Sequence, residues 1–159
     1  MSIQEGAQLP EATLHTMQDG RPTPVTTADL FGGKKVVLFA VPGAFTPTCS
    51  QAHLPGYVVH ADAIKAKGVD SIVCLSVNDA FVMGAWGDNA NAEALQMVGD
   101  GNGDFTKALG LEMDGSGFGL GTRSQRYAMI VDDGTVTKLA VEDPGKLEVS
   151  AAEAILEAL

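Results

Sequence analysis

Cysteine is scarce in this chain, and Cys49 and Cys74 are the only two among 159 residues. They form no C-x-x-C pair, which argues against a dithiol oxidoreductase, and no cluster with histidines at metal-ligand spacing. They are also too few for the disulfide framework of a small secreted domain. In a reducing compartment we expect both to be free thiols.

Basic residues and long apolar runs are also lacking. Ten Lys and Arg against twenty Asp and Glu give a net charge of −10, which repels nucleic acid and anionic membranes as partners. Residues 1–8 carry no secretory signal pattern, and no apolar run approaches the roughly 20 residues of a spanning helix. We therefore expect a soluble, cytoplasmic protein. No signature of a metal, haem, flavin or nicotinamide cofactor is present, so we expect no cofactor.

Strand-like apolar runs alternate with helical patterns along most of the chain. The predicted strands cover residues 12–17, 35–41, 71–77, 95–98, 127–131 and 135–141. The predicted helical segments cover residues 26–31, 47–67, 80–86, 105–109 and 150–159. Early alternation, followed by a hairpin and a last helix, predicts one α/β domain over residues 1–159. We expect a thioredoxin-like fold with a central mixed β-sheet flanked by helices.

Glycine and proline mark the connections between these elements. Residues 18–22 are predicted to form a turn, and the glycine-rich residues 115–121 to form flexible or tightly turning backbone. Pro55-Gly56 falls inside the helix predicted over 47–67, so we expect a kink there.

Cys49 stands where the apolar run 36–40 gives way to a helical pattern. Backbone N–H groups in the first turn of a helix are unpaired and the helix dipole is positive there, so a thiol at that point tends to ionise. The sequence therefore favours a reactive Cys49 over the alternative, a small buried hydrophobic residue. Thr46 lies three residues earlier, where its hydroxyl could donate to the sulfur or cap the helix.

The stretch from Pro42 to Cys49, Pro-Gly-Ala-Phe-Thr-Pro-Thr-Cys, resembles the active-site signature of the peroxiredoxins, P-x-x-x-T-x-x-C. The residues at the variable positions of this signature resemble those of the type II, peroxiredoxin 5-like branch of that family. Further matching segments extend over nearly the whole chain: 53–57, 74–83, Trp86 and 126–129.

The resemblance implies a thiol-specific peroxidase. Cys49 would attack the terminal oxygen of hydrogen peroxide or an alkyl hydroperoxide and become a sulfenic acid. Thr46 would hydrogen-bond the peroxide and the sulfur. The catalytic arginine of the family falls on Arg126, at the start of a predicted strand, with Arg123 as a competitor. The same residues would also serve a peroxide sensor that oxidises once without turnover.

The resemblance also implies supporting roles around the sulfur. Pro42 would shape the pocket, while Gly43 and Thr48 would line it and backbone N–H groups would complete a polar cradle. His53 lies four residues after Cys49, about one helical turn away on the same face. It could tune the thiolate, but packing or indirect support is favoured over direct proton transfer.

Cys74 separates two mechanisms of recycling. Relatives that form an intramolecular disulfide usually carry a resolving cysteine near the C-terminus, and residues 141–159 contain none. Cys74 lies in an apolar run, which favours a buried structural thiol and leaves a resolving role open. The resemblance implies an external reductant, with glutathione and glutaredoxin first and thioredoxin as the alternative.

The resemblance further implies a homodimer. Phe45 and Phe81 are the candidate contacts, and each could equally be a core residue.

Overall fold

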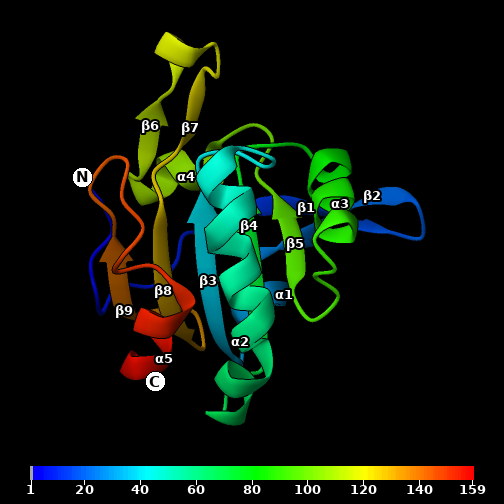
Figure 1. The fold of residues 1–159 in the computed structure, drawn as a ribbon. Helices are drawn as coiled ribbons and strands as arrows, with labels where there is room; N and C mark the ends of the chain where they lie inside the picture. Colours follow the sequence, from blue (N-terminus) through cyan, green and yellow to red (C-terminus); the bar gives the residue numbers. More distant parts are fainter. Residues whose placement is uncertain (1) are drawn as a thin grey trace.

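A seven-stranded mixed sheet organises the chain (Figure 1). In the computed structural model, which describes residues 2–159, the strand order is β2-β1-β5-β4-β3-β8-β9. The strands are β1 (Thr13–Gln18), β2 (Arg21–Thr26), β3 (Lys35–Val41), β4 (Ser71–Ser76), β5 (Gln96–Gly99), β8 (Tyr127–Asp132) and β9 (Thr135–Val141). β3, β4 and β5 run parallel, and the remaining pairings are antiparallel. The predicted thioredoxin-like α/β fold is confirmed.

Helices cover both faces of this sheet. They are α1 (Thr27–Phe31), α2 (Leu54–Ala66), α3 (Ala80–Asn89), α4 (Asp104–Leu109) and α5 (Ala152–Ala158). Buried residues of α2, α3 and α5 belong to one apolar cluster, and those of α1 and α4 to a second cluster across the sheet. No helix in the described part of the chain is long and apolar enough to cross a membrane.

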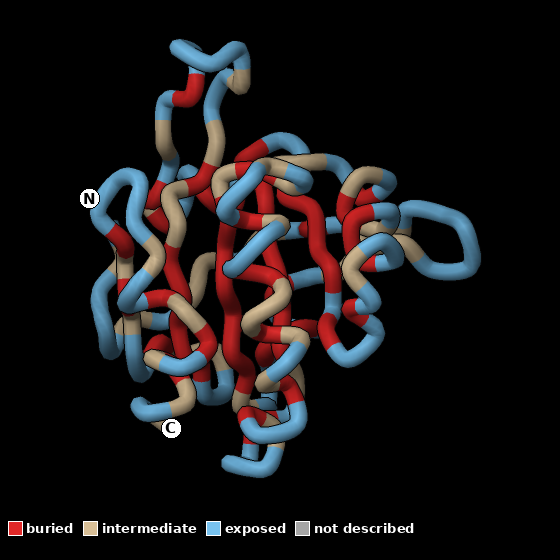
Figure 2. The backbone as a smooth tube through the Cα atoms, in the orientation of Figure 1, coloured by how far each residue is buried: buried red, intermediate tan, exposed pale blue. Residues whose placement is uncertain are grey.

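β3 shows why the central strands read as continuous apolar runs. Val37, Phe39 and Val41 face the cluster under α2, while the residues between them face the other cluster. Every residue from Val36 to Val41 is at most 1% exposed, and Figure 2 shows the buried tube passing through the middle of the sheet. Both faces are covered, so alternation between polar and apolar residues is absent.

Two elements depart from the sequence-based expectation. β2 begins inside the segment predicted as a turn, and it carries Pro22 and Pro24. It lies at the edge of the sheet, where a missing backbone N–H removes no essential ladder bond, so proline is tolerated. The glycine-rich segment is ordered by a small hairpin, β6 (Glu112–Asp114) with β7 (Thr122–Ser124), around a 3₁₀ turn, η2 (Ser116–Phe118).

A wide turn directly precedes the long helix α2. A π-helical turn, η1 (Cys49–His53), precedes α2, and the Leu54 N–H donates to the Cys49 carbonyl five residues back. Pro55 has no N–H, and its ring excludes the carbonyl four residues before it, so the turn ahead of the proline widens. A wide turn that begins at the cysteine therefore lies ahead of Pro55, and the kink expected at Pro55-Gly56 stays a prediction.

Two glycines give a matched test of this packing. A Cβ on Gly99 would lie 2.6 Å from the Asn78 carbonyl oxygen, whereas a Cβ on Gly56 meets only the Ala152 side chain at 3.9 Å. Gly99→Ala should lower the free energy of unfolding by roughly 1–3 kcal/mol because the backbone must shift. Gly56→Ala should raise it by about 0.5–1 kcal/mol through helix propensity. Urea unfolding of the two variants checks both signs, and equal midpoints would contradict the packing.

Candidate active site

Cys49 and Arg126 meet where β3 ends and β8 begins. In the antiparallel β3–β8 pair, Ala40 lies opposite Tyr127, so the chain leaves β3 at the edge where it enters β8. The Cys49 side chain is fully buried, and Arg126 Nη2 donates to its Sγ at 3.2 Å. A guanidinium donor favours negative charge on the sulfur, because charge-assisted hydrogen bonds are the stronger ones. The arrangement is suited to a nucleophilic thiolate.

His53 lies behind Arg126 and does not donate to the sulfur. Arg126 Nη1 donates to His53 Nδ1 at 2.8 Å, and His53 Nε2 lies 3.1 Å from the Ser150 carbonyl oxygen. Arginine only donates, so Nδ1 is bare and Nε2 carries the proton. Burial, and then the charge of Arg126, lowers the pKa of His53 to about 4. The imidazole is therefore neutral and orients the guanidinium.

Thr46 presents an acceptor to the site. Its Oγ1 donates to the Gly43 carbonyl at 2.7 Å, so the hydroxyl proton is already used. The expected donation from Thr46 to the sulfur is replaced by this bond, which leaves the oxygen lone pairs free to accept an O–H. A Cβ on Gly43 would lie 2.7 Å from Arg123 Nη1 and 3.1 Å from Thr46 Cγ2, so a larger residue there would displace the Arg123 side chain.

Arg123, the alternative to Arg126 in the sequence analysis, contacts the backbone of the same turn and not the sulfur. Its Nη1 donates to the Pro42 carbonyl at 3.2 Å, and its Nε donates to the Leu120 carbonyl at 3.1 Å. The structure thus separates the two arginines, one on the sulfur and one on the proline carbonyl.

A pocket of about 580 Å³ opens at Arg126, and neither Cys49 nor Thr46 is among the residues that line it. Pro42, Thr48 and Arg126 line it together with residues 112–114 and 142–145. Three of the predicted site residues therefore line one pocket.

Residues that sequence reasoning had not assigned to the site hold the cysteine turn in place. Asn78 Oδ1 accepts the Ala44 N–H at 3.0 Å, and Trp86 Nε1 donates to Ser50 Oγ at 3.0 Å. Phe45, which lies between Ala44 and Ser50 in the chain, adopts a φ of +65°, which is strained for a residue other than glycine. Asn78 and Trp86 both belong to the matching segments of the sequence, which was the available signal.

Phe45 and Phe81 are exposed, at 51% and 60%, so the alternative in which they are core residues is wrong.

Cys74 is the second buried thiol. It lies on β4, opposite Phe39 of β3 and Met97 of β5, in the same apolar cluster as Cys49. Burial, and after it the neighbouring Cys49, raises the pKa of the Cys74 thiol well above its ordinary value. Both cysteines are free, and Cys74 is a protonated thiol within the sheet.

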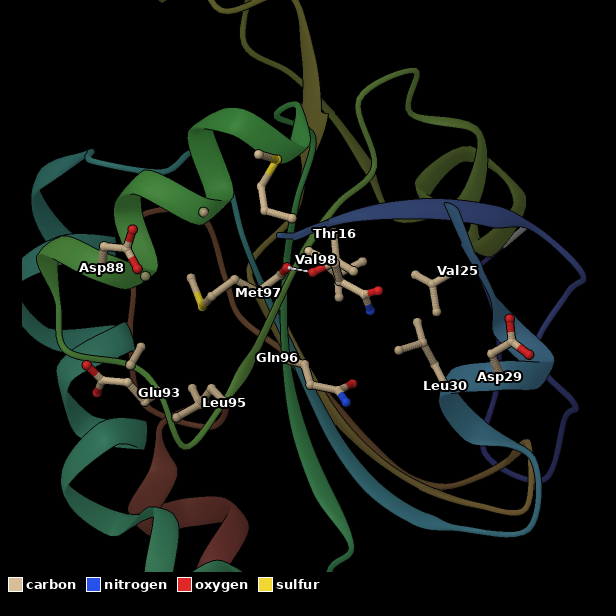
Figure 3. A pocket seen from close by; sticks show the side chains of 15 residues that line it. Thr16, Val25, Asp29, Leu30, Asp88, Glu93, Leu95, Gln96, Met97 and Val98 are labelled. Carbon is tan, nitrogen blue, oxygen red and sulfur yellow. Dashed lines mark hydrogen bonds between the residues drawn. The ribbon is translucent and has the colours of Figure 1, made fainter. Parts of the chain in front are cut away.

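A separate hollow of about 400 Å³ lies at the other end of the sheet (Figure 3). β1 and β5 share only the pair His15 and Gly99, so the strands diverge, and Thr16 Oγ1 bridges to the Met97 carbonyl at 2.8 Å. None of the predicted site residues lines it. Over residues 2–159 no group of three or more His, Cys, Asp or Glu is placed to hold a metal ion.

Comparison with known proteins agrees with this geometry. The model of the Redoxin family matches residues 4–156. Peroxiredoxin-2E-2, chloroplastic, of Oryza sativa subsp. japonica is 52% identical over 165 residues, covering 99% of this chain and 73% of that protein. Peroxiredoxin-2B of Arabidopsis thaliana is 47% identical over 156 residues, covering 98% of this chain and 88% of that protein.

A solved structure is also similar to this chain. The crystal structure of reduced Prx3 from Vibrio vulnificus in complex with H₂O₂ has a TM-score of 0.95 and 62% identity, and the match covers 98% of both chains. The extent of the family match and the identity to these relatives show that the chain belongs to the Redoxin family, as a thiol peroxidase of the type II branch of the peroxiredoxins.

Proposed function

We propose that Cys49 carries the peroxidase reaction, and the observation that supports it is the Arg126 donor on its sulfur. The thiolate attacks the terminal oxygen of a hydroperoxide, an S–O bond forms and the O–O bond breaks. The sulfenic acid keeps the hydrogen of the terminal oxygen, and the leaving oxygen takes a proton from solvent to become water or an alcohol. Prx3 of Vibrio vulnificus was solved with H₂O₂, which supports hydrogen peroxide as one substrate.

Groups around Cys49 bind the peroxide and stabilise the charge that develops during the reaction. Thr46 accepts the O–H of the terminal oxygen, which its own donation to the Gly43 carbonyl leaves it free to do. Arg126 stabilises the charge that moves from sulfur to the leaving oxygen. Pro42 and Thr48 line the pocket by which the substrate approaches.

Cys49 is recycled by an external thiol, with glutathione and glutaredoxin first and thioredoxin as the alternative. Two observations support this order. Cys74 is fully buried and protonated within the sheet, so a bridge to Cys49 requires local unfolding. The pocket beside Arg126, about 580 Å³, has room for a small thiol.

The protein acts in the cytoplasm as a homodimer. Phe45 and Phe81 support the dimer because both rings are exposed, and large exposed aromatics are typical of interfaces.

The two arginines test the assignment of the site. Arg126→Lys keeps the charge but loses the fork that reaches both sulfur and His53, so the rate constant of Cys49 oxidation should fall roughly 100-fold. Arg123 donates to the Pro42 and Leu120 carbonyls and makes no bond to the sulfur, so Arg123→Lys should lower the rate constant less than about tenfold. Stopped-flow measurement with one equivalent of hydrogen peroxide gives both values, and Cys49→Ser should show no oxidation. Equal losses in the two lysine variants would refute the role of Arg126.

Recycling is tested by steady-state turnover of peroxide. With glutathione and glutaredoxin, the wild type and Cys74→Ala should turn over at rates within about twofold, since the buried thiol takes no part. Alanine is used because a buried serine would lack a partner. Turnover with thioredoxin alone that disappears in Cys74→Ala would instead assign resolution to Cys74, and a reaction that stops at one equivalent would indicate a sensor.

The low pKa of His53 predicts a dependence of stability on pH. The imidazole stays neutral in the folded protein down to about pH 4 but binds a proton near pH 6.5 when unfolded. The unfolded state thus holds more protons between these values, and the free energy of unfolding falls as pH falls through that window. His53→Asn should lack this component, so its stability relative to wild type should rise by about 2 kcal/mol between pH 8 and pH 5. Urea unfolding of both proteins at pH 8 and pH 5 measures this change. If the difference in free energy of unfolding between His53→Asn and the wild type is the same at both pH values, a neutral, buried His53 is excluded.

A further inference from the structure

The chain folds back behind the active site after β9. Glu142 follows β9 directly, and its N–H donates to the Arg126 carbonyl at 2.9 Å, extending the ladder in which Tyr127 pairs with Val141. Side chains of residues paired across an antiparallel ladder lie on the same face, so Glu142 and Arg126 share one face of the sheet. In Figure 1 the segment that follows is the orange-to-red stretch between β9 and α5.

The Glu142 carboxylate is bonded to its own loop. Its Oε2 accepts the Glu148 N–H at 2.7 Å, the Ser150 N–H at 2.8 Å and the Ser150 hydroxyl at 2.7 Å. The residue is only 8% exposed. Burial would raise the pKa of Glu142, but the hydrogen bonds from Ser150 and the 148–149 backbone outweigh it and lower the pKa. The carboxylate is therefore charged at neutral pH, and it closes the loop over residues 143–149.

Ser150 passes this constraint to the active site through its carbonyl. The Ser150 oxygen lies 2.7 Å from the Tyr57 hydroxyl and 3.1 Å from His53 Nε2, and accepts from both. An acceptor at Nε2 fixes the tautomer in which Nδ1 is bare, and only that tautomer accepts from Arg126 Nη1. A continuous chain of contacts thus runs from Glu142 to the sulfur of Cys49.

We propose that Glu142 is a positioning residue for the peroxidase reaction: by holding Ser150, it fixes the tautomer and orientation of His53 and so keeps Arg126 on Cys49. This inference rests on the roles proposed above for Cys49 and Arg126. We call the hydrogen bonds that the Glu142 carboxylate accepts from Glu148 and Ser150 the clamp. When the clamp is lost, the Ser150 carbonyl is free to move and His53 takes up either tautomer. Arg126 then loses the hydrogen bond to His53 that holds it on the sulfur. The carboxylate is also kept from pairing with Arg126, which would draw the guanidinium away from sulfur.

Glu142→Gln tests the clamp, with Glu148→Gln as the matched control. Both variants remove one negative charge from the same segment, but Glu148 is exposed and contributes only its backbone N–H to the clamp. In Glu142→Gln the rate constant for oxidation of Cys49 by hydrogen peroxide should fall roughly tenfold, as for the loss of a charged hydrogen bond. In Glu148→Gln it should stay at the wild-type value.

The ring nitrogens of His53 provide a readout that does not depend on activity. Nitrogen-15 spectra of the wild type should show a single Nε2–H tautomer, and those of Glu142→Gln a mixture with Nδ1–H. Ser150→Ala removes the hydroxyl bond to Glu142 and the 3.5 Å contact of that hydroxyl with His53 Nε2, but it keeps the Ser150 N–H and carbonyl. It should give a smaller shift in the same direction, which provides a second test if Glu142→Gln does not fold.

Wild-type spectra and a wild-type rate in folded Glu142→Gln would overturn the proposal, as would equal rate losses in Glu142→Gln and Glu148→Gln. A failure of the proposed function differs, because Arg126→Lys would then leave the rate unchanged while the His53 signals still responded to Glu142.

Discussion

The contact between the Arg126 guanidinium and the Cys49 sulfur is the interaction around which the site is built. Neither group is favourable on its own in this position, because a buried charge is costly unless it is paired and hydrogen-bonded. The β3–β8 register solves this by bringing the end of one strand to the start of the other, so that both groups arrive from rigid elements. Because a small lateral shift of either strand would separate the sulfur from its donor, the continuous apolar packing of β3 serves the chemistry as well as the fold.

The charge pattern behind Arg126 concentrates its positive charge on the sulfur. A carboxylate directly behind the guanidinium would orient it but also neutralise it. Neutral His53 orients it without an opposing charge, and burial together with Arg126 itself keeps the imidazole neutral by lowering its pKa to about 4. The nearest carboxylate along the chain of contacts, Glu142, is bonded to the N–H and hydroxyl of Ser150.

Sequence reasoning succeeded where the signal is local. The buried strands followed from apolar runs, and Cys49 followed from a signature at a strand end. Arg126 came from the family resemblance, and only the structure separated it from Arg123. β2 was missed because its prolines suggest a turn, and only its place at the sheet edge makes them acceptable. The clamp of Glu142 and Ser150 on His53 joins residues nearly a hundred positions apart, and no periodicity or motif in one sequence encodes a contact of that kind.

Cys49 and Cys74 show that exposure alone does not decide reactivity here. Both side chains are fully buried in the same apolar cluster, yet they face different partners. Cys74 is enclosed by β3 and β5, and burial raises the pKa of its thiol, which disfavours the nucleophilic thiolate. Cys49 stands at the start of a wide helical turn with a guanidinium on its sulfur. The distinction therefore comes from a directed donor and an irregular turn, and both depend on how Pro55 and β8 are placed around the cysteine.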